Sequence, residues 1–277
     1  MSTTVMVAPD LGDVEQTTEQ NPRGRLPFRE AVRVEELPEH LEWHWIDWVA
    51  TVTIPLVFAT ATLTNGLGVS LWTRGFIDLG LRAALCLVLV WAYRRMLARH
   101  WQAFNRARWR SLALVVGGAV VMQMIVTGVR SVLPASVIAW GPQAPDDGLS
   151  AAIDVGSLSV GGLFLFTFIA LGPLFTAVIE DTVFRHTFLM KIPVWRHAIL
   201  AVALIIVNGL AFGAVHYYNF GSFGATLPFA AAGVFFNLVY LWTRNIWHVL
   251  GIHLFNNFVL GVAIMPVLIV AKLFGVY

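Results

Sequence analysis

From Trp45 to its C-terminus the chain is a succession of long apolar segments with few charges inside them. Each is about as long as the roughly 20 residues that a helix needs to cross the hydrocarbon core of a bilayer. Hydrophobic residues make up 58% of the chain and charged residues 12%, whereas soluble domains hold about 25% charged residues. This pattern predicts an all-α polytopic membrane protein, a bundle of about seven transmembrane helices. The expected spans cover approximately residues 45–66, 76–97, 111–133, 157–190, 197–217, 224–243 and 246–270.

The segment 157–190 is too long for one simple span. Gly172 and Pro173 interrupt it, and a proline removes a backbone donor and clashes with the preceding turn of a helix. A break there would raise the number of helices to eight.

The first 43 residues differ from the rest of the chain. Nine of the sixteen acidic residues fall there, between Asp10 and Glu42, and apolar periodicity is weak. The stretch also lacks the basic start and apolar run of a signal peptide. We therefore expect residues 1–43 to be a mostly disordered tail, with a short interfacial helix near its end as a further option. Residues 44–277 are expected to be the transmembrane domain.

Basic residues predict the orientation in the membrane. The 94–110 connection carries six arginines, and basic connections stay on the cytoplasmic side. Lys191, Arg196 and Arg244 fall in connections that alternate onto the same side, while Asp146 and Asp147 lie in an opposite, acidic loop. The N-terminus is then cytoplasmic. Arginine greatly outnumbers lysine, which favours the plasma membrane of a bacterium.

The net charge of +2 is too small to indicate nucleic acid as a partner. Membrane lipids are the expected partners.

Glu180 is the only glutamate after residue 43, and it lies at the end of an apolar run beside Asp181. On a helix Asp181 and Arg185 are one turn apart and can pair. Glu180 points about 100° away from that pair. The spacing therefore leaves one carboxylate paired and the other available as a general base or acid.

Two further groups recur in later spans. Phe212 and His216 are one helical turn apart, and so are His253 and Asn257, whereas the neighbouring Asn256 does not share that face. Ionisable residues inside spans indicate function, because inserting them costs several kcal/mol without compensation. The alternative is that each histidine only joins helices, as polar side chains do in bundles. A lone glutamate together with two histidines and an asparagine favours a site.

The order E-[ED]-x-x-x-R, F-x-x-x-H and H-x-x-x-[ND] resembles the signature of the CPBP intramembrane proteases. This group includes the eukaryotic CAAX prenyl endopeptidase and bacteriocin-immunity relatives. The resemblance covers roughly residues 160–265, within a protease-like core at about 157–270. The residues that carry it are Glu180, Asp181, Arg185, Phe212, His216, His253 and Asn257.

The resemblance implies catalytic roles for four of these residues. Glu180 would activate the water that attacks a carbonyl of a peptide or membrane-protein substrate, helped by His216. His253 and Asn257 would stabilise the oxyanion or help to hold a metal, and Asp181, Arg185 and Phe212 would support the site. Glu180, His216 and His253 also make a plausible zinc set, so zinc is a candidate cofactor. The residues leave open whether the enzyme is a metallopeptidase or a glutamate peptidase.

Two residues depart from the family pattern. Asp181 stands where a second glutamate is usual, and His186 follows the arginine where glycine is common. His186 is expected either to crowd a close helix contact or to reach the interface.

The depth of the residues in the membrane also constrains the site. A straight helix over 197–217 would place His216 roughly 30 Å from the cytoplasmic face. For His216 to meet Glu180 and His253, residues 191–205 must first dip into the membrane or lie along its surface.

The sequence supports three functions. The first is an intramembrane endopeptidase, the second a non-enzymatic scaffold or immunity factor on the same fold, and the third a proton-coupled transporter. Neither the H-E-x-x-H motif of zinc peptidases nor the G-x-S-x-G motif of serine hydrolases is present.

Overall fold

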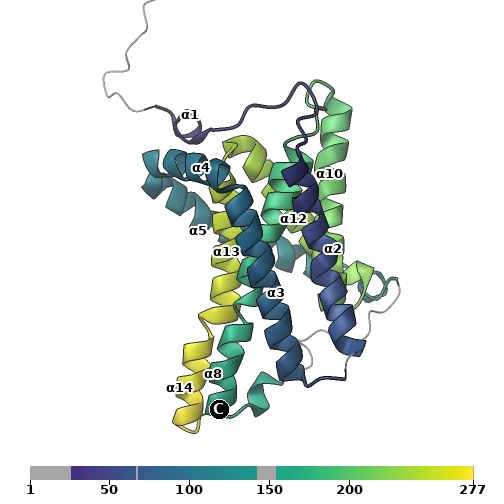
Figure 1. The fold of residues 1–277 in the computed structure, drawn as a ribbon, viewed down its shortest axis with the longest axis vertical. Helices are drawn as coiled ribbons and strands as arrows, with labels where there is room; N and C mark the ends of the chain where they lie inside the picture. Colours follow the sequence, from purple (N-terminus) through teal and green to yellow (C-terminus); the bar gives the residue numbers. More distant parts are fainter. Residues whose placement is uncertain (1–25, 67, 142–153, 277) are drawn as a thin grey trace, which may run out of the picture.

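The computed structural model describes residues 26–66, 68–141 and 154–276. Within these ranges the chain is helical, with no strand (Figure 1). The α-helices are α1 (Phe28–Val32), α2 (Trp45–Gly66), α3 (Leu71–Ala92), α4 (Arg94–Arg106), α5 (Arg108–Val132), α6 (Ala135–Ile138), α8 (Val160–Ile169), α9 (Gly172–Asp181), α10 (Ala198–Ala214), α11 (Tyr217–Phe220), α12 (Phe223–Thr243), α13 (Ile246–Asn257) and α14 (Met265–Leu273). The 3₁₀ turn η1 (Val155–Ser157) and the π-helical segments η2 (Thr182–Leu189) and η3 (Phe258–Val262) complete the described elements.

Seven apolar helical segments correspond to the seven expected spans. By length and composition, five could cross a membrane: Leu71–Ala92, Arg108–Val132, Val160–Leu189, Phe223–Thr243 and Ile246–Leu273. Two shorter apolar helices, Trp45–Thr60 and Ala198–Ala214, accompany them. The prediction of a polytopic helical bundle is confirmed.

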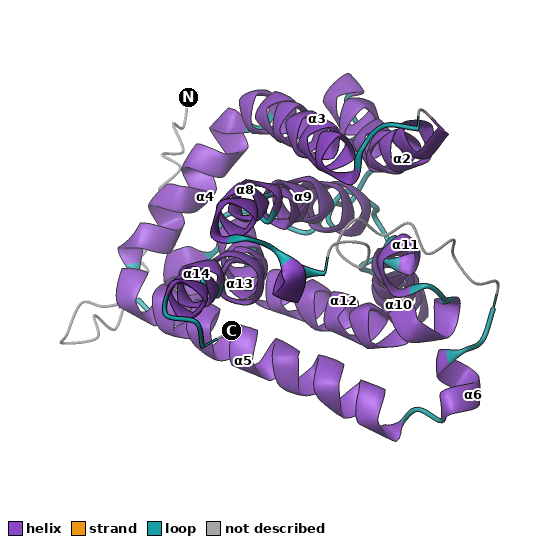
Figure 2. Cartoon of the chain, turned by 90° about the horizontal axis from the view of Figure 1, so that it is seen from below, coloured by secondary structure: helices purple, strands orange, loops and turns teal. Residues whose placement is uncertain are grey.

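The helices form layers around α9. Figure 2 shows α9 between the α2–α3 pair on one side and the row made by α13, α12 and α10 on the other. Helix α5 covers the outer face of α12 and α13. Helix α9 therefore lies between other helices, and its C-terminal residues Ile179, Glu180 and Asp181 are buried.

Small residues let α10 and α12 approach closely. A Cβ added to Gly213 would lie 2.7 Å from the backbone nitrogen of Ala230, and one added to Gly233 would lie 2.9 Å from the carbonyl oxygen of Gly209. Glycines at such contacts are typical of membrane helices, whose association depends on close packing rather than on the hydrophobic effect. The amide of Asn237 also donates to the carbonyl of Ile205 at 2.9 Å.

The segment 157–190 is broken at the expected place. Helix α8 ends at Ile169, and α9 begins at Gly172 with Pro173 in its first turn. The last span is broken too, so that α14 packs beside α8 through Phe166, Ile169 and Met265 (Figure 1).

The expected second span, 76–97, has different bounds in the structure. Helix α3 runs from Leu71 to Ala92, Tyr93 ends it, and α4 continues at an angle across one end of the bundle (Figure 1). Helix α4 buries an apolar stripe and exposes most of its arginines, because its apolar residues recur at helical spacing. The basic connection is thus an amphipathic helix rather than a loop.

The N-terminal segment is more ordered than expected. Residues 26–43 pack over the end of the bundle near α4, and Val32 is fully buried. His100 Nε2 lies 2.8 Å from Glu35 Oε1, and the amide of Asn245 donates to the carbonyl of Val32 at 3.0 Å. These bonds explain why the predicted tail is wrong over residues 26–43. Residues 1–25 and the acidic pair Asp146 and Asp147 lie outside the described residues.

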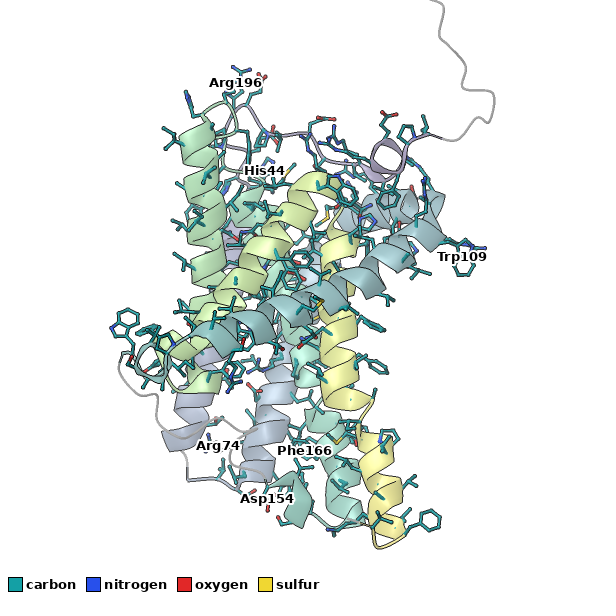
Figure 3. The ribbon with its side chains drawn as sticks, turned by 180° about the vertical axis from the view of Figure 1, so that it is seen from behind. His44, Arg74, Trp109, Asp154, Phe166 and Arg196 are labelled. Atoms are coloured by element: carbon teal, nitrogen blue, oxygen red, sulfur yellow. The ribbon has the colours of Figure 1, made fainter. Side chains whose placement is uncertain are left out.

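The basic connections gather at the end of the molecule that this segment covers. Arg196, labelled at that end in Figure 3, pairs with Glu39, and Arg244 pairs with Glu36 at 3.0 Å. The three basic connections therefore share one side, as their alternation predicts. That this side faces the cytoplasm stays a prediction.

A polar cluster around Asp47 joins α2 to Lys191, which follows the C-terminal end of η2. Both oxygens of the buried Asp47 carboxylate accept from Nζ of Lys191 at 2.7 Å. The hydroxyl of Tyr93 donates to the same carboxylate at 2.8 Å. A buried ion pair that is also hydrogen-bonded fixes geometry, because removing one partner leaves an uncompensated charge.

Candidate active site

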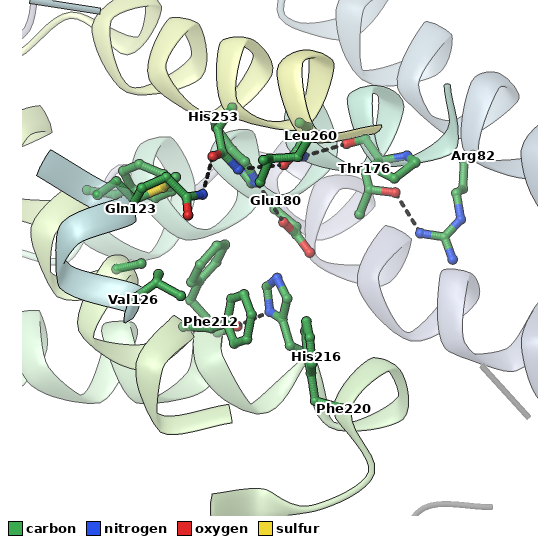
Figure 4. Close-up of a pocket in the computed structure, with 17 residues that line it drawn as sticks. Arg82, Gln123, Val126, Thr176, Glu180, Phe212, His216, Phe220, His253 and Leu260 are labelled. Carbon is green, nitrogen blue, oxygen red and sulfur yellow. Dashed lines mark hydrogen bonds and ion pairs between the residues drawn. The ribbon is translucent and has the colours of Figure 1, made fainter. Parts of the chain in front are cut away.

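The structure brings Glu180, His216, His253 and Asn257 to the wall of one cavity of about 350 Å³. They come from α9, from the turn after α10, and from α13 (Figure 4). Aromatic and apolar side chains form much of the remaining wall, including Phe212, Phe220, Phe229, Phe236 and Leu260. The cavity thus combines one carboxylate and two imidazoles with an apolar lining. Their catalytic roles stay a prediction that the experiments below test.

Glu180 reaches this cavity because α9 stays α-helical up to Asp181. Glu180 is 7% exposed, and its Oε2 lies 3.8 Å from Nε2 of His253. That distance exceeds a hydrogen bond. It is short enough for one water molecule to contact both atoms.

Asp181 points the other way and orients His253. Its Oδ2 lies 3.3 Å from Nδ1 of His253, and its Oδ1 lies 3.3 Å from Nη1 of Arg185. The expected division therefore exists: Asp181 pairs with Arg185, and Glu180 faces the cavity. The structure adds the contact to His253, which places the hydrogen on Nδ1 and turns Nε2 toward Glu180.

Arg185 is fully buried and surrounded by aromatic rings. Its guanidinium carbon lies 4.1 Å from the ring centre of Phe212 and 5.0 Å from that of Phe236. Nη2 donates weakly to the carbonyl of Gly233 at 3.5 Å, while Nε and Nη1 have no hydrogen-bond acceptor among the described residues. Cation–π attraction, worth up to about 2 kcal/mol when desolvated, helps to compensate the buried charge.

Phe212 links this cation to the second histidine. Its ring centre lies 5.0 Å from the ring of His216 and 5.8 Å from that of His253. Nδ1 of His216 lies 2.9 Å from the carbonyl oxygen of Phe212. A carbonyl only accepts, so Nδ1 carries the hydrogen and Nε2 offers a lone pair. In Figure 4 the His216 ring and the Glu180 carboxylate face one another across the cavity.

A chain of side-chain amides borders the cavity on the side of α13. Gln123 donates to Asn256, Asn256 donates to Asn257 at 3.2 Å, and Asn257 donates to the carbonyl of Pro173 at 3.1 Å. Asn257 therefore has one N–H committed to α9 and a second one outside that bond. Asn256, expected on another face, also lines the cavity.

Arg82 and Thr176 are further polar wall residues that motif matching missed. Arg82 donates from Nε to Asp78 and from Nη1 to Thr176, both at 2.6 Å. A signal was present in the sequence, because Asp78 and Arg82 repeat the spacing of Asp181 and Arg185 inside an apolar span. Gln123 is a single polar residue in an apolar span, so no spacing pattern marked it as a site residue.

His186 faces away from the cavity. It is 7% exposed, its ring packs edge-on against Tyr93 at 5.3 Å, and Nδ1 lies 3.4 Å from the hydroxyl of Tyr240. It does not reach the interface, and it does not line the cavity. The imidazole at this position is accommodated by an edge-on ring contact with Tyr93 and a polar contact with Tyr240.

The expected detour over residues 191–205 is wrong. Helix α10 runs without a break from Ala198 to Ala214, and only the connection before it is irregular. That connection reaches the end of the molecule at Arg196 (Figure 3), and α10 begins two residues later. A full-length α10 can then bring His216 down to the level of Glu180.

The residues do not form a ready-made zinc site. Among the described residues, no group of three or more His, Cys, Asp or Glu side chains is placed to hold a metal ion. Glu180 and His253 approach each other, but the His216 ring lies on the opposite wall (Figure 4). We therefore derive no step through a metal, and zinc stays a prediction tested below.

Residues 162–259, which include every one of these motifs, match a family model described as type II CAAX prenyl endopeptidase Rce1-like. This segment is similar to the Rce1-like family. The predicted resemblance is confirmed, and at the level of the family it supports an intramembrane protease of the CAAX type. The matched segment supplies Glu180, His216, His253 and Asn257, whereas Arg82 and Gln123 come from helices outside it. No curated protein and no solved structure matches the chain.

Proposed function

We propose that the chain is an intramembrane endopeptidase in which Glu180 activates water for attack on a peptide bond. One observation supports this most directly: Glu180 Oε2 and His253 Nε2 lie 3.8 Å apart at a shared cavity, with the histidine held by Asp181. Two fixed acceptors at this spacing can orient one water between them. A carboxylate that is not already paired can take a proton from that water.

The first step transfers a water proton to Glu180 as the water oxygen attacks the carbonyl carbon. Nε2 of His253 accepts the other hydrogen of the water. Nε2 of His216, which keeps a lone pair because its Nδ1 is bound to Phe212, can replace His253 as that acceptor once the oxygen has moved onto the carbonyl. The carbonyl π electrons move to oxygen, giving a tetrahedral intermediate with an oxyanion. The remaining N–H of Asn257 is the donor available to that oxyanion.

The second step returns the proton. Glu180 donates it to the nitrogen of the scissile bond, the C–N bond breaks, and the products are a carboxylic acid and an amine. The carboxylate is thereby regenerated. The apolar wall limits competing water, which strengthens the electrostatic contacts during both steps.

The substrate class follows from the cavity and its setting. Aromatic residues from α11 and α12, including Phe220 and Phe229, suit apolar side chains or a lipid-modified segment. A peptide or membrane protein approaching at the bilayer is therefore the proposed substrate. We also propose that the protein lies in a bacterial plasma membrane, with the end that carries the basic connections facing the cytoplasm.

The test compares cells that express the wild-type chain or Glu180→Gln, with new peptide termini in membrane fractions identified by mass spectrometry. We expect cleavage products only with the wild type, since the amide cannot act as a base and rates fall about 10²–10⁴-fold. Glu36→Gln, an exposed glutamate at the end of the bundle, is the matched control and should cleave normally.

Identical termini in the wild type and Glu180→Gln would overturn the peptidase. If Glu180→Gln also rescued a deletion phenotype, the same fold would be acting as a scaffold. Substrate uptake that needs a proton gradient would instead favour a transporter.

A further inference from the structure

Arg82 is a charged group in the cavity wall that the proposed hydrolysis does not use. It comes from α3, outside the segment that matches the family model, and its side chain is 20% exposed. Figure 4 shows it beyond Thr176, on the opposite side of that residue from Glu180. An arginine within a membrane span is costly, so its position at a cavity indicates a ligand or a structural partner.

The contacts of Arg82 leave part of its guanidinium available. Nε donates to Asp78 and Nη1 to Thr176, which uses two of five N–H groups. Among the described residues, no hydrogen bond involves Nη2. A Cβ added to Gly172 would lie 3.6 Å from Cδ of Arg82, so the side chain lies along the break between α8 and α9. These contacts hold the guanidinium in place and leave donors beside the cavity.

The spacing along α9 relates this guanidinium to the reacting groups. Thr176, which accepts from Arg82, lies four residues before Glu180, about 6 Å along the helix. An extended peptide covers about 3.3 Å per residue. Because Arg82 lies beyond Thr176 (Figure 4), a group bound there would lie at least about two residues from a peptide bond held at Glu180.

We propose that Arg82 binds a carboxylate of the substrate peptide, either its C-terminus or an acidic side chain. The inference rests on the proposed peptidase function and adds a specificity residue to it. A carboxylate matches the planar fork of a guanidinium, and it is the anion that an unmodified peptide carries. Asp78 pairs with the same guanidinium, so it limits the strength of binding.

The test measures binding rather than turnover. The full chain carrying Glu180→Gln is purified in detergent and incubated with a pool of apolar octapeptides in three forms. One form has a free C-terminus, one is amidated, and one is amidated but contains a single internal glutamate. Bound peptides are quantified by mass spectrometry for this protein and for the same protein with Arg82→Gln, Asp78→Asn or Arg74→Gln added.

We expect carboxylate-bearing peptides to bind about tenfold or more tightly than the uncharged amides. Arg82→Gln should abolish the preference, and Asp78→Asn should increase it by removing the competing charge. Arg74, two turns earlier on α3 and not in the cavity wall, should be dispensable. Whether the free terminus or the internal glutamate is preferred identifies the source of the carboxylate.

A preference that survives Arg82→Gln would overturn the proposal. If Arg82→Gln failed to fold, Asp78→Asn would decide, because an unchanged or weaker preference there contradicts a guanidinium site. Hydrolysis of the same pool by the wild type tests the peptidase separately. An Arg82-dependent preference without hydrolysis would leave the carboxylate site standing and remove the peptidase.

Discussion

Asp181 Oδ2 lies 3.3 Å from Nδ1 of His253, so the carboxylate next to Glu180 in the chain fixes the histidine opposite it. The contact joins α9 to α13 at the cavity and sets which imidazole nitrogen faces Glu180. An aspartate in this arrangement acts through the histidine, and its replacement tests that role directly.

Replacing Asp181 by Asn should lower peptide hydrolysis by about 10- to 100-fold, as losses of carboxylates that orient a histidine do. Asp181→Glu, the residue usual at this position in the family that the motifs resemble, should retain most of the activity. Hydrolysis rates in detergent, with thermal unfolding of each variant, provide the measurement. Equal losses in both variants would show that packing at this position, not orientation of His253, controls activity.

Replacing Gly213 by Ala should destabilise the bundle. The added Cβ would lie 2.6 Å from Cβ of Ala230, and overpacking of this kind costs about 1–3 kcal/mol. His216 follows three residues later, so hydrolysis should fall together with the melting temperature. The control is Gly117→Ala on α5, where a Cβ meets nothing within 4 Å. A melting temperature for Gly213→Ala equal to that of the control would contradict the packing described.

Removing metal ions with a chelator should leave the rate of peptide hydrolysis unchanged, as expected when Glu180 works without a metal. The measurement is activity of the purified protein after dialysis against 1,10-phenanthroline, with and without added zinc. The reason is the arrangement of the ligands, since the described residues hold no group of three placed around one ion. Loss of activity that zinc restores would assign the cavity to a metallopeptidase.

Acid should release the N-terminal segment. The hydrogen bond from His100 lowers the pKa of Glu35 below its usual 4.5, and Arg99, 3.6 Å away, acts in the same direction. A lowered pKa stabilises the docked segment above pH 4.5, and this contribution is lost as the pH falls through the lowered value. Hydrogen exchange at the amides of Val34 and Glu35, which bond to Arg244, should therefore quicken below about pH 4.5 relative to α4.

In Glu35→Gln the same amides should exchange faster already at neutral pH and lose this extra acid dependence. Exchange in the wild type that follows only the intrinsic pH trend, with no excess over α4, would remove the role assigned to Glu35.

The sequence predicted the spans and the key motifs because both depend on local pattern. Apolar runs of about twenty residues indicate spans, and i, i+4 spacing placed Asp181 beside Arg185. What local pattern could not supply was tertiary pairing. The contact of Asp181 with His253 joins residues 72 positions apart, and the bond from Gln123 to Asn256 spans 133 positions.

The same reason explains the errors. The segment 26–43 was assigned to the tail because its own composition is polar, yet its order comes from His100, Arg244 and Asn245 elsewhere in the chain. The path of α10 was predicted wrongly because apolar periodicity does not show how long the irregular connection before this helix is.

The π-helical segment η2 sets the rotation between two contacts that hold the helix continuing from α9. It joins Asp181, which holds His253, to Lys191, which holds Asp47 on α2. In an α-helix each residue adds 100° of rotation, while the wider π turn adds less. The angular phase between these two anchors therefore depends on the number of residues in η2. Deleting one residue there would twist one anchor away from its partner, so this short stretch sets the torsional alignment of the helix that carries Glu180.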